Sequence, residues 1–265
     1  MTLRVIAIDW SGAKLHPERK IWLAEATADG ELVRLETGRD REQIADCLIE
    51  QAPHGEEMII GFDFAFSFPE WFVRERGYAS APALWAALAA DSVADTWLTD
   101  CEFPFWGKPH RPKPALDEHF RGTEKNVGAT AGISCKSVFQ IGGAGAVGTG
   151  SIRGMPILHR LHEAGLGVWP FTAPAMATAV EIYPRLLTGP VNKRKEECRR
   201  TYIHDHFAAI GPTFRELACS SEDAFDAAVS ALVMAKHSRE LRTLPPAADA
   251  QTLLEGEIWR PRVAP

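Results

Sequence analysis

The stretch LRVIAID, residues 3–9, is a short apolar run that ends on an acid, Asp9. Such a run predicts a buried β-strand. The same pattern returns in MIIGFD, residues 58–63, which ends on Asp63. A helical pattern over residues 40–51 precedes this second run, and a buried strand that follows a helix usually joins its sheet in parallel. The sequence therefore predicts central strands with an aspartate at their carboxyl ends.

Further strands are expected around these two runs. Residues 20–26 and 31–36 have strand-like patterns, and the Asp-Gly pair between them is a strong hairpin signal. The chain thus opens with three strands, which we expect to form an antiparallel meander. Another candidate central strand, residues 177–183, carries Glu181 and is stopped by Pro184.

Helical patterns alternate with these strands. Besides residues 40–51, helices are expected at residues 68–76, 83–98, 152–164, 195–209, 214–219 and 221–237, and a short strand at residues 167–171. The last helix is the clearest, because Ser221 can cap it and its alanines provide a packing face. The pattern predicts an α/β fold whose mixed sheet, an antiparallel meander plus parallel strands, is flanked by helices.

The expected organisation is one domain over residues 1–240. We expect an irregular insertion rich in Gly and Pro at about residues 77–172, and a C-terminal surface tail at residues 241–265. Within the insertion, residues 100–150 show little periodicity. A long irregular stretch inside a compact domain is usually functional or an insertion.

Composition excludes several classes of protein. No window reaches the roughly 18 uninterrupted apolar residues of a membrane span, and the first residues do not form a signal peptide. Five cysteines lie far apart without a C-x-x-C pair, which argues against a disulfide framework or a zinc site. We therefore expect a cytoplasmic protein that does not enter a membrane. Composition does not indicate the oligomeric state.

The charge is unevenly distributed along the chain. The net charge of −6 does not mark a nucleic-acid binder. Residues 105–160, however, carry eight Lys and Arg against three acids. A local basic surface of this kind can still meet phosphates, although a solvated loop region would have the same composition.

Acidic residues recur in the expected central strands, as Asp9, Asp63 and Glu181. An acid at the carboxyl end of such a strand packs badly unless it faces a crevice and holds a cation. The motif EDAFD adds Asp223 and Asp226, which share one helical face. Converging carboxylates repel each other and are stable together only with protons or metal ions between them. Hard oxygen ligands suit Mg²⁺ or Mn²⁺.

Three of these acids also have a structural explanation. Asp9 could cap the turn that follows it, Asp63 could accept hydrogen bonds from the next loop, and Asp223 could be only a helix N-terminal acid. A shared metal site makes a stronger demand on the structure. The carboxylates of Asp9, Asp63 and Asp226 must then converge within about one ligand shell.

Four motifs resemble those of domain-of-unknown-function family 429, whose members are predicted to be RNase H-like nucleases. The motifs are IAIDWSG (residues 6–12), IIGFDFAFSFP (59–69), VEIYPR (180–185) and EDAFDAAVSALVMA (222–235). The last motif also resembles the D-x-x-D-A helix of RuvC-type Holliday-junction resolvases. The resemblance implies an RNase H-like sheet and a metal-dependent nuclease that acts on nucleic acid.

The resemblance also implies roles for the acids. Asp9 would bridge two metal ions, while Asp63 and Asp226 would hold one each. Glu181, the family's fifth-strand acid, or Asp223 would orient the attacking water. The fourth-strand acid of RuvC and RNase H is usually Glu, and the shorter Asp63 in this chain alters the metal spacing.

The glycine-rich segment SVFQIGGAGAVGTGSIRG, residues 137–154, contains G-x-G-x-x-G. It lacks the uninterrupted helix start of a dinucleotide fingerprint and the Lys of a Walker loop. We expect a flexible loop whose backbone N–H groups approach phosphates, although a Gly-rich linker on the surface remains an alternative. The residues expected to bind substrate are Ser11, Lys136, Gln140, Ser151 and Arg153.

Two other functions stay open. DWSGAK, residues 9–14, resembles the first phosphate loop of the sugar-kinase and actin superfamily, which implies an ATP-dependent phosphotransferase. Such enzymes normally duplicate their fold, and 265 residues is short for two copies. The other alternative is a non-catalytic binding protein with a degenerate site, which the negative net charge favours over a nuclease.

Overall fold

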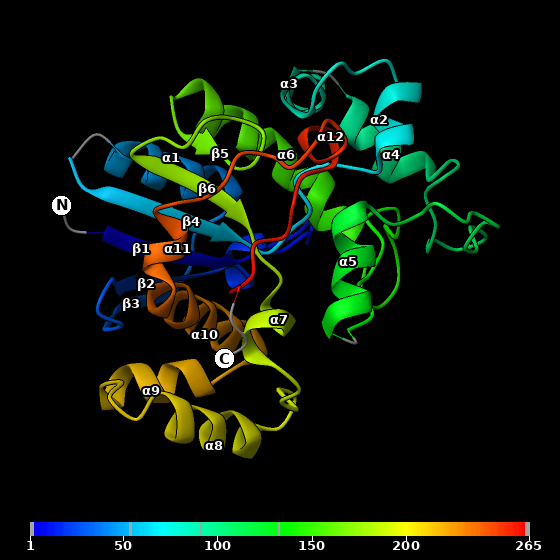
Figure 1. The fold of residues 1–265 in the computed structure, drawn as a ribbon. Coiled ribbons are helices and arrows are strands. Elements are labelled where there is room, and N and C mark those ends of the chain that lie inside the picture. Colours follow the sequence, from blue (N-terminus) through cyan, green and yellow to red (C-terminus); the bar gives the residue numbers. More distant parts are fainter. Residues whose placement is uncertain (1–2, 53–54, 91, 132, 263–265) are drawn as a thin grey trace.

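The computed structural model describes residues 3–52, 55–90, 92–131 and 133–262, with the backbone only for residues 129–131. In this part of the chain six strands form one mixed sheet in the order β3-β2-β1-β4-β6-β5, and helices cover both faces (Figure 1). The strands are β1 (Leu3–Asp9), β2 (Trp22–Thr27), β3 (Leu32–Thr37), β4 (Glu57–Phe62), β5 (Gly167–Val168) and β6 (Ala177–Glu181).

The strand directions bring the acids to one edge of the sheet. β1 pairs antiparallel with β2, and β2 with β3, whereas β4, β6 and β5 continue in parallel with β1. The predicted meander and parallel strands are therefore confirmed. Since β1, β4 and β6 run in the same direction, Asp9, Asp63 and Glu181 all lie at their carboxyl ends.

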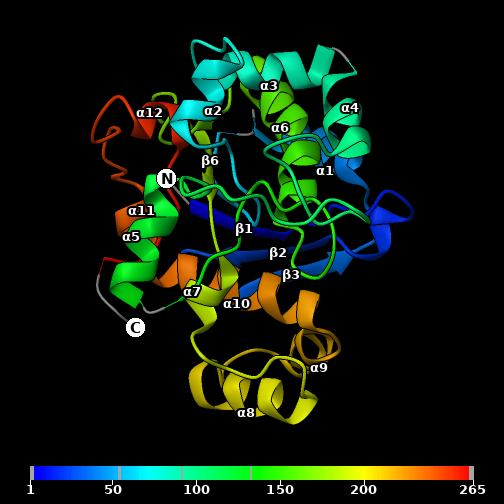
Figure 2. The ribbon, with the colours of Figure 1, turned by 90° about the vertical axis from the view of Figure 1, so that its right-hand side faces the viewer.

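The alternation of side chains along each strand separates two cores. In β1, Ile6 and Ile8 pack on one face, and Val5 and Ala7 on the other. Helices α1 (Arg41–Gln51), α3 (Ala81–Ala90) and α6 (Val147–Glu163) cover the first face. Helix α10 (Glu222–Lys236) covers the second, with α9 (Pro212–Cys219) and α8 (Glu196–His206) beyond it (Figure 2).

Helix α10 confirms the clearest helical prediction. Ser221 caps it, since the side chain accepts a hydrogen bond from the Ala224 amide. Ala227, Ala228 and Ala231 are buried in the α10 core. These small side chains let the helix lie close to β1 and β2, and its first turns reach the edge where the strands end.

The glycine-rich segment differs from the expected flexible loop. Helix α6 already begins at Val147, so Gly148 and Gly154 are buried in a helix. A Cβ at Gly148 would lie 2.0 Å from the Val138 carbonyl oxygen, and one at Gly154 would lie 2.5 Å from the Phe64 ring. The glycines therefore serve close packing, which outweighs their low helix propensity.

The remaining helices refine the predicted boundaries. The helix expected at residues 83–98 is divided into α3 and α4, and the irregular residues 100–150 contain the unexpected α5. The other bounds are α2 (Glu70–Glu75), α4 (Val93–Asp100), α5 (Gly122–Ala131), α7 (Pro184–Thr188), α11 (Ser238–Leu241) and α12 (Thr252–Glu255), with a 3₁₀ turn at Pro17–Arg19. None of the helices described here is long and apolar enough to cross a membrane.

The C-terminal segment is the expected surface tail only over residues 242–253, which are mostly exposed. Leu254, Ile258 and Trp259 are buried, and Ile258 forms a bridge to Glu181 at the end of β6. The Glu255 carboxylate accepts hydrogen bonds from the Glu70 and Gly122 amides. The buried side chains from Leu254 to Trp259 therefore pack this part of the segment against the rest of the domain.

Candidate functional site

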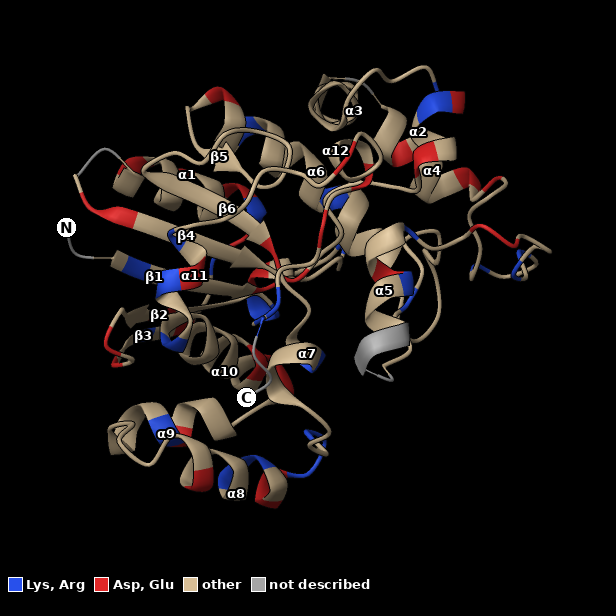
Figure 3. Ribbon diagram, in the orientation of Figure 1, with Lys and Arg blue, Asp and Glu red and all other residues tan. Residues whose placement is uncertain are grey.

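Three aspartates surround the carboxyl ends of β1 and β4. Asp9 ends β1, Asp63 follows β4, and Asp226 lies in the first turns of α10. The Asp63 amide donates a hydrogen bond of 3.1 Å to the carbonyl of Ile8, which fixes the two strand ends side by side. Asp9 and Asp226 are 9% and 7% exposed, whereas Asp63 borders a cavity. Figure 3 shows acidic residues gathered where these strands end.

The three carboxyl groups disfavour one another's ionisation. Burial raises the pKa of Asp9 well above its usual range, and the charges of Asp63 and Asp226 raise it further. Burial and the charge of Asp226 raise the pKa of Asp63 to about 8. Burial raises the pKa of Asp226 to about 6, against the opposing charge of Lys193. The surrounding protein therefore does not stabilise all three aspartates in their ionised form.

Lys193 enters this cluster from the segment between α7 and α8. Its ammonium forms an ion pair with Oδ2 of Asp226. Oδ1 of Asp226 is buried and has no hydrogen-bond partner among the described residues. Sequence reasoning missed Lys193, whose only signal was the basic run Lys193-Arg194-Lys195 in a loop.

The carboxylates do not meet the strict requirement of one shared ligand shell. Within the described part of the chain, no three Asp, Glu, His or Cys side chains converge closely enough to hold an ion. Like charges repel, and one oxygen of Asp226 is paired with Lys193. The donor chemistry nevertheless fits Mg²⁺ or Mn²⁺, because the cluster offers hard carboxylate oxygens, including the unpartnered Oδ1 of Asp226.

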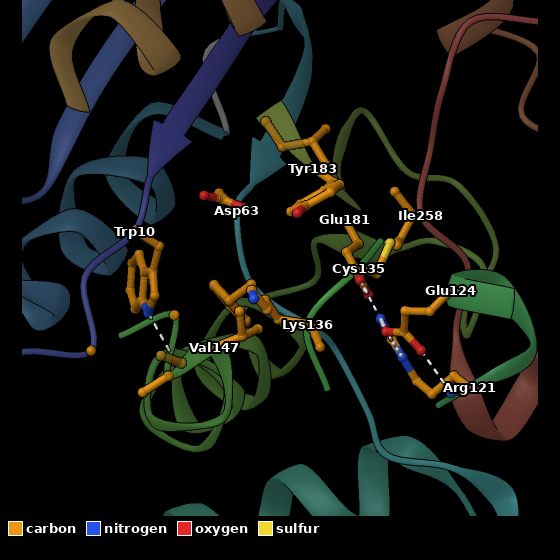
Figure 4. Close-up of a pocket in the computed structure, with 17 residues that line it drawn as sticks. Trp10, Asp63, Arg121, Glu124, Cys135, Lys136, Val147, Glu181, Tyr183 and Ile258 are labelled. Atoms are coloured by element: carbon orange, nitrogen blue, oxygen red, sulfur yellow. Dashed lines mark hydrogen bonds and ion pairs between the residues drawn. The ribbon is translucent and has the colours of Figure 1, made fainter. Parts of the chain in front are cut away.

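Glu181 lies apart from this cluster, on the α6 side of the sheet with Ala177 and Ala179 of the same strand. Arg121 donates to both of its carboxylate oxygens, at 2.5 and 2.8 Å (Figure 4). The Phe66 amide also donates to Glu181, at 2.9 Å. Burial raises the pKa of Glu181, and Arg121 opposes this shift. Both oxygens of Glu181 are thus bound by the protein, although the residue borders the same cavity as Asp63. Its predicted catalytic role stays a prediction.

Arg121 was missed because its partners come from distant parts of the chain. It is fully buried, and it also binds Glu124 and the backbone carbonyl of Glu255. One guanidinium therefore joins β6, α5 and the C-terminal segment. The sequence showed only one of eight basic residues in an irregular region.

Asp223 lies at the rim of the acidic cluster. It is half-buried in the first turn of α10. Burial raises its pKa, and the charge of Lys20 opposes the shift. Its predicted role as a metal ligand or water-orienting base stays a prediction.

Most of the residues expected to bind substrate are engaged in internal contacts. The Ser11 hydroxyl accepts from the Ala13 amide, the Gln140 amide donates to the Ala144 carbonyl, and Arg153 donates to the Gly12 carbonyl. Ser151 is fully buried, and its hydroxyl accepts from Ala65 and donates to Val147. Ser151 therefore cannot touch a substrate without unfolding α6. Lys136 is exposed and borders a cavity, and its predicted role in substrate binding stays a prediction.

Two adjoining cavities open beside Asp63. One of about 270 Å³ is bordered by Trp10, Lys136 and Tyr183, among others (Figure 4). The other, of about 440 Å³, is lined by Tyr183, Lys193 and Asp226. Asp63 and Tyr183 line both cavities, so these two side chains lie where the cavities adjoin.

Two other ionisable groups border the first cavity. Burial raises the pKa of Tyr183 to about 12 and that of Cys135 to about 11. Both groups therefore stay protonated at neutral pH. This protonation state makes Cys135 a poor nucleophile, because the thiolate is the reactive form.

Comparisons of the chain with protein-family models, with curated proteins and with solved structures find no match. The motif resemblance to family 429 stays a prediction.

Proposed function

We propose that the protein is a metal-dependent hydrolase that cleaves phosphodiester bonds in nucleic acid, with Mg²⁺ or Mn²⁺ held by Asp9, Asp63 and Asp226. The observation that carries the proposal is the excess of buried carboxylates over cations at the ends of β1 and β4. A divalent cation offsets the repulsion that raises their pKa values.

The strand order supports an RNase H-like fold for this site. An antiparallel meander of β3, β2 and β1 is followed by the parallel strands β4 and β6. The acids stand at the ends of β1 and β4, and a third comes from α10, which packs across β1 and β2. This is the arrangement that the motif resemblance implies.

Side chains that line the two cavities could bind a phosphodiester together with the metal ion. A bound divalent ion would stabilise the negative charge that develops on the attacking and leaving oxygens. Lys136 in one cavity and Lys193 in the other offer positive charge to an anionic chain on either side of Asp63. Tyr183, protonated at neutral pH, can donate a hydrogen bond to a phosphate oxygen between them.

The test is a cleavage screen with Mg²⁺ and Mn²⁺ on single-stranded, duplex, hybrid and branched substrates. We expect metal-dependent cleavage by the wild type and its loss in Asp9→Asn. Asp29→Asn is the matched control, because Asp29 is exposed in the turn between β2 and β3. Cleavage that persists in Asp9→Asn would contradict the proposal. ATP consumption without cleavage would favour a phosphotransferase.

A further inference from the structure

The ion pair between Lys193 and Asp226 places a protein cation inside the acidic cluster. The Lys193 side chain is 22% exposed and that of Asp226 is 9% exposed. Both residues line the 440 Å³ cavity together with Asp63. A partly buried ammonium needs a carboxylate partner, and Asp226 provides it.

The charges of the cluster do not balance. Asp9, Asp63 and Asp226 carry three negative charges when ionised, and Lys193 supplies one positive charge. Leaving out Asp223, which is half-buried at the rim of the cluster, two negative charges remain, which equals the charge of one divalent cation. A second divalent ion would leave the cluster with a net positive charge, and burying uncompensated charge is costly.

The two oxygens of the Asp226 carboxylate differ in their hydrogen bonds. Oδ2 is taken by the ammonium of Lys193, while Oδ1 is buried and has no partner in the described part of the chain. Asp226 therefore has one oxygen bound by a cation and one oxygen that can still bind a metal ion.

We propose that Lys193 is a resident cation of the site, so that the site binds one divalent metal ion and the ammonium takes the place of a second. This inference rests on the proposed function, and it changes the expected role of Asp9, which holds one ion and does not bridge two. The Lys193 ammonium also lines the larger cavity, where its remaining N–H groups can donate to a phosphate oxygen.

Metal stoichiometry tests this inference without any substrate. Mn²⁺ is titrated into the full chain by calorimetry, and the loaded protein is examined by electron paramagnetic resonance. We expect one ion per chain in the wild type, with the spectrum of an isolated Mn²⁺. Lys193→Met should take up two ions and show the signature of two exchange-coupled ions, because its acids have lost their resident cation.

Lys195→Met is the matched control. Lys195 is exposed in the same segment and pairs with the exposed Glu197 at 3.7 Å, so this variant should still bind one ion. Lys193→Gln, which keeps an N–H donor for Asp226 but no charge, should also bind two ions and replaces Lys193→Met if that variant does not fold.

Two ions in the wild type, or one ion in both the wild type and the folded Lys193 variants, would overturn the inference and leave the proposed function standing. If the wild type binds none and Lys193→Met binds one, Lys193 is a competitor of the metal, and the inference is wrong. If neither binds Mn²⁺, the proposed function fails together with it.

Discussion

The guanidinium of Arg121 binds both carboxylate oxygens of Glu181 in the interior of the protein, at 2.5 and 2.8 Å. The same guanidinium holds Glu124 and the backbone carbonyl of Glu255. Loss of one partner of a buried ion pair costs far more than loss of an exposed pair, because an uncompensated charge stays behind.

Arg121→Met should therefore lower the free energy of unfolding by about 3–5 kcal/mol in urea denaturation. Arg74→Met is the control. It breaks the exposed Arg74–Glu70 pair and should change stability by less than about 1 kcal/mol. The double variant Arg121→Met/Glu181→Gln should recover part of the loss. A small effect of Arg121→Met, equal to that of Arg74→Met, would show that the network is not structural.

Close packing at α6 gives a second prediction. A Cβ at Gly154 would lie 2.5 Å from the Phe64 ring, so Gly154→Ala should destabilise the protein by about 1–3 kcal/mol. At the exposed Gly128 in α5, the nearest atom to a new Cβ is 3.8 Å away. Gly128→Ala should therefore stabilise by about 0.5–1 kcal/mol. Thermal unfolding of both variants checks these opposite signs, and equal shifts would contradict the packing argument.

The C-terminal segment gives a third prediction. Trp259 is buried, and its amide donates to the carbonyl of Glu181. Trp259→Ala should cost about 3–5 kcal/mol, as expected for truncation of a buried aromatic side chain. Leu253→Ala, in the same segment but 46% exposed, should change stability by no more than about 0.5 kcal/mol. A Trp259→Ala protein as stable as Leu253→Ala would mean that the segment is a surface tail after all.

The pKa of Asp63 predicts how stability depends on pH. An aspartate in an unfolded chain has a pKa of about 3.9, whereas burial and Asp226 raise that of folded Asp63 to about 8. The folded state thus binds the proton more tightly. The contribution of protonated Asp63 to the free energy of unfolding is complete below about pH 4 and is lost as the pH rises toward about 8.

Removal of this carboxyl should therefore stabilise the protein only at higher pH. With a chelator present, Asp63→Asn should be more stable than the wild type by about 1 kcal/mol or more near pH 8, since one pKa unit corresponds to about 1.4 kcal/mol. Near pH 4 the gain should vanish. Asp29→Asn, at an exposed turn, should show no such difference. If Asp63→Asn raised the free energy of unfolding equally at both pH values, the ionised Asp63 carboxylate would not be the cause of the instability.

Local sequence patterns predicted the strands and helices whose formation depends mainly on neighbouring residues. The apolar runs that end on Asp9 and Asp63 formed β1 and β4, with Asp63 directly after β4, because a short apolar run bounded by turn signals favours a buried strand. Strand direction then brought both acids to one edge. Ser221 and the alanines of α10 were equally informative, because capping and small-residue packing depend on neighbouring positions.

Contacts between distant segments could not be read from the sequence. Lys193 pairs with a residue 33 positions away, and Arg121 with one 60 positions away, both from segments without periodicity. Gly148 and Gly154 suggested a flexible loop because glycine disfavours helices, yet contacts with Val138 and Phe64 require glycine in a helix.

The central claim is that Asp9, Asp63 and Asp226 hold a divalent metal ion, and anomalous diffraction tests it most directly. Crystals grown or soaked with MnCl₂ would be measured at the manganese absorption edge. We predict an anomalous peak about 2.0–2.6 Å from carboxylate oxygens of Asp9, Asp63 and Asp226. A manganese peak elsewhere, or none between these three aspartates with Lys193 still paired to Asp226, would contradict the account.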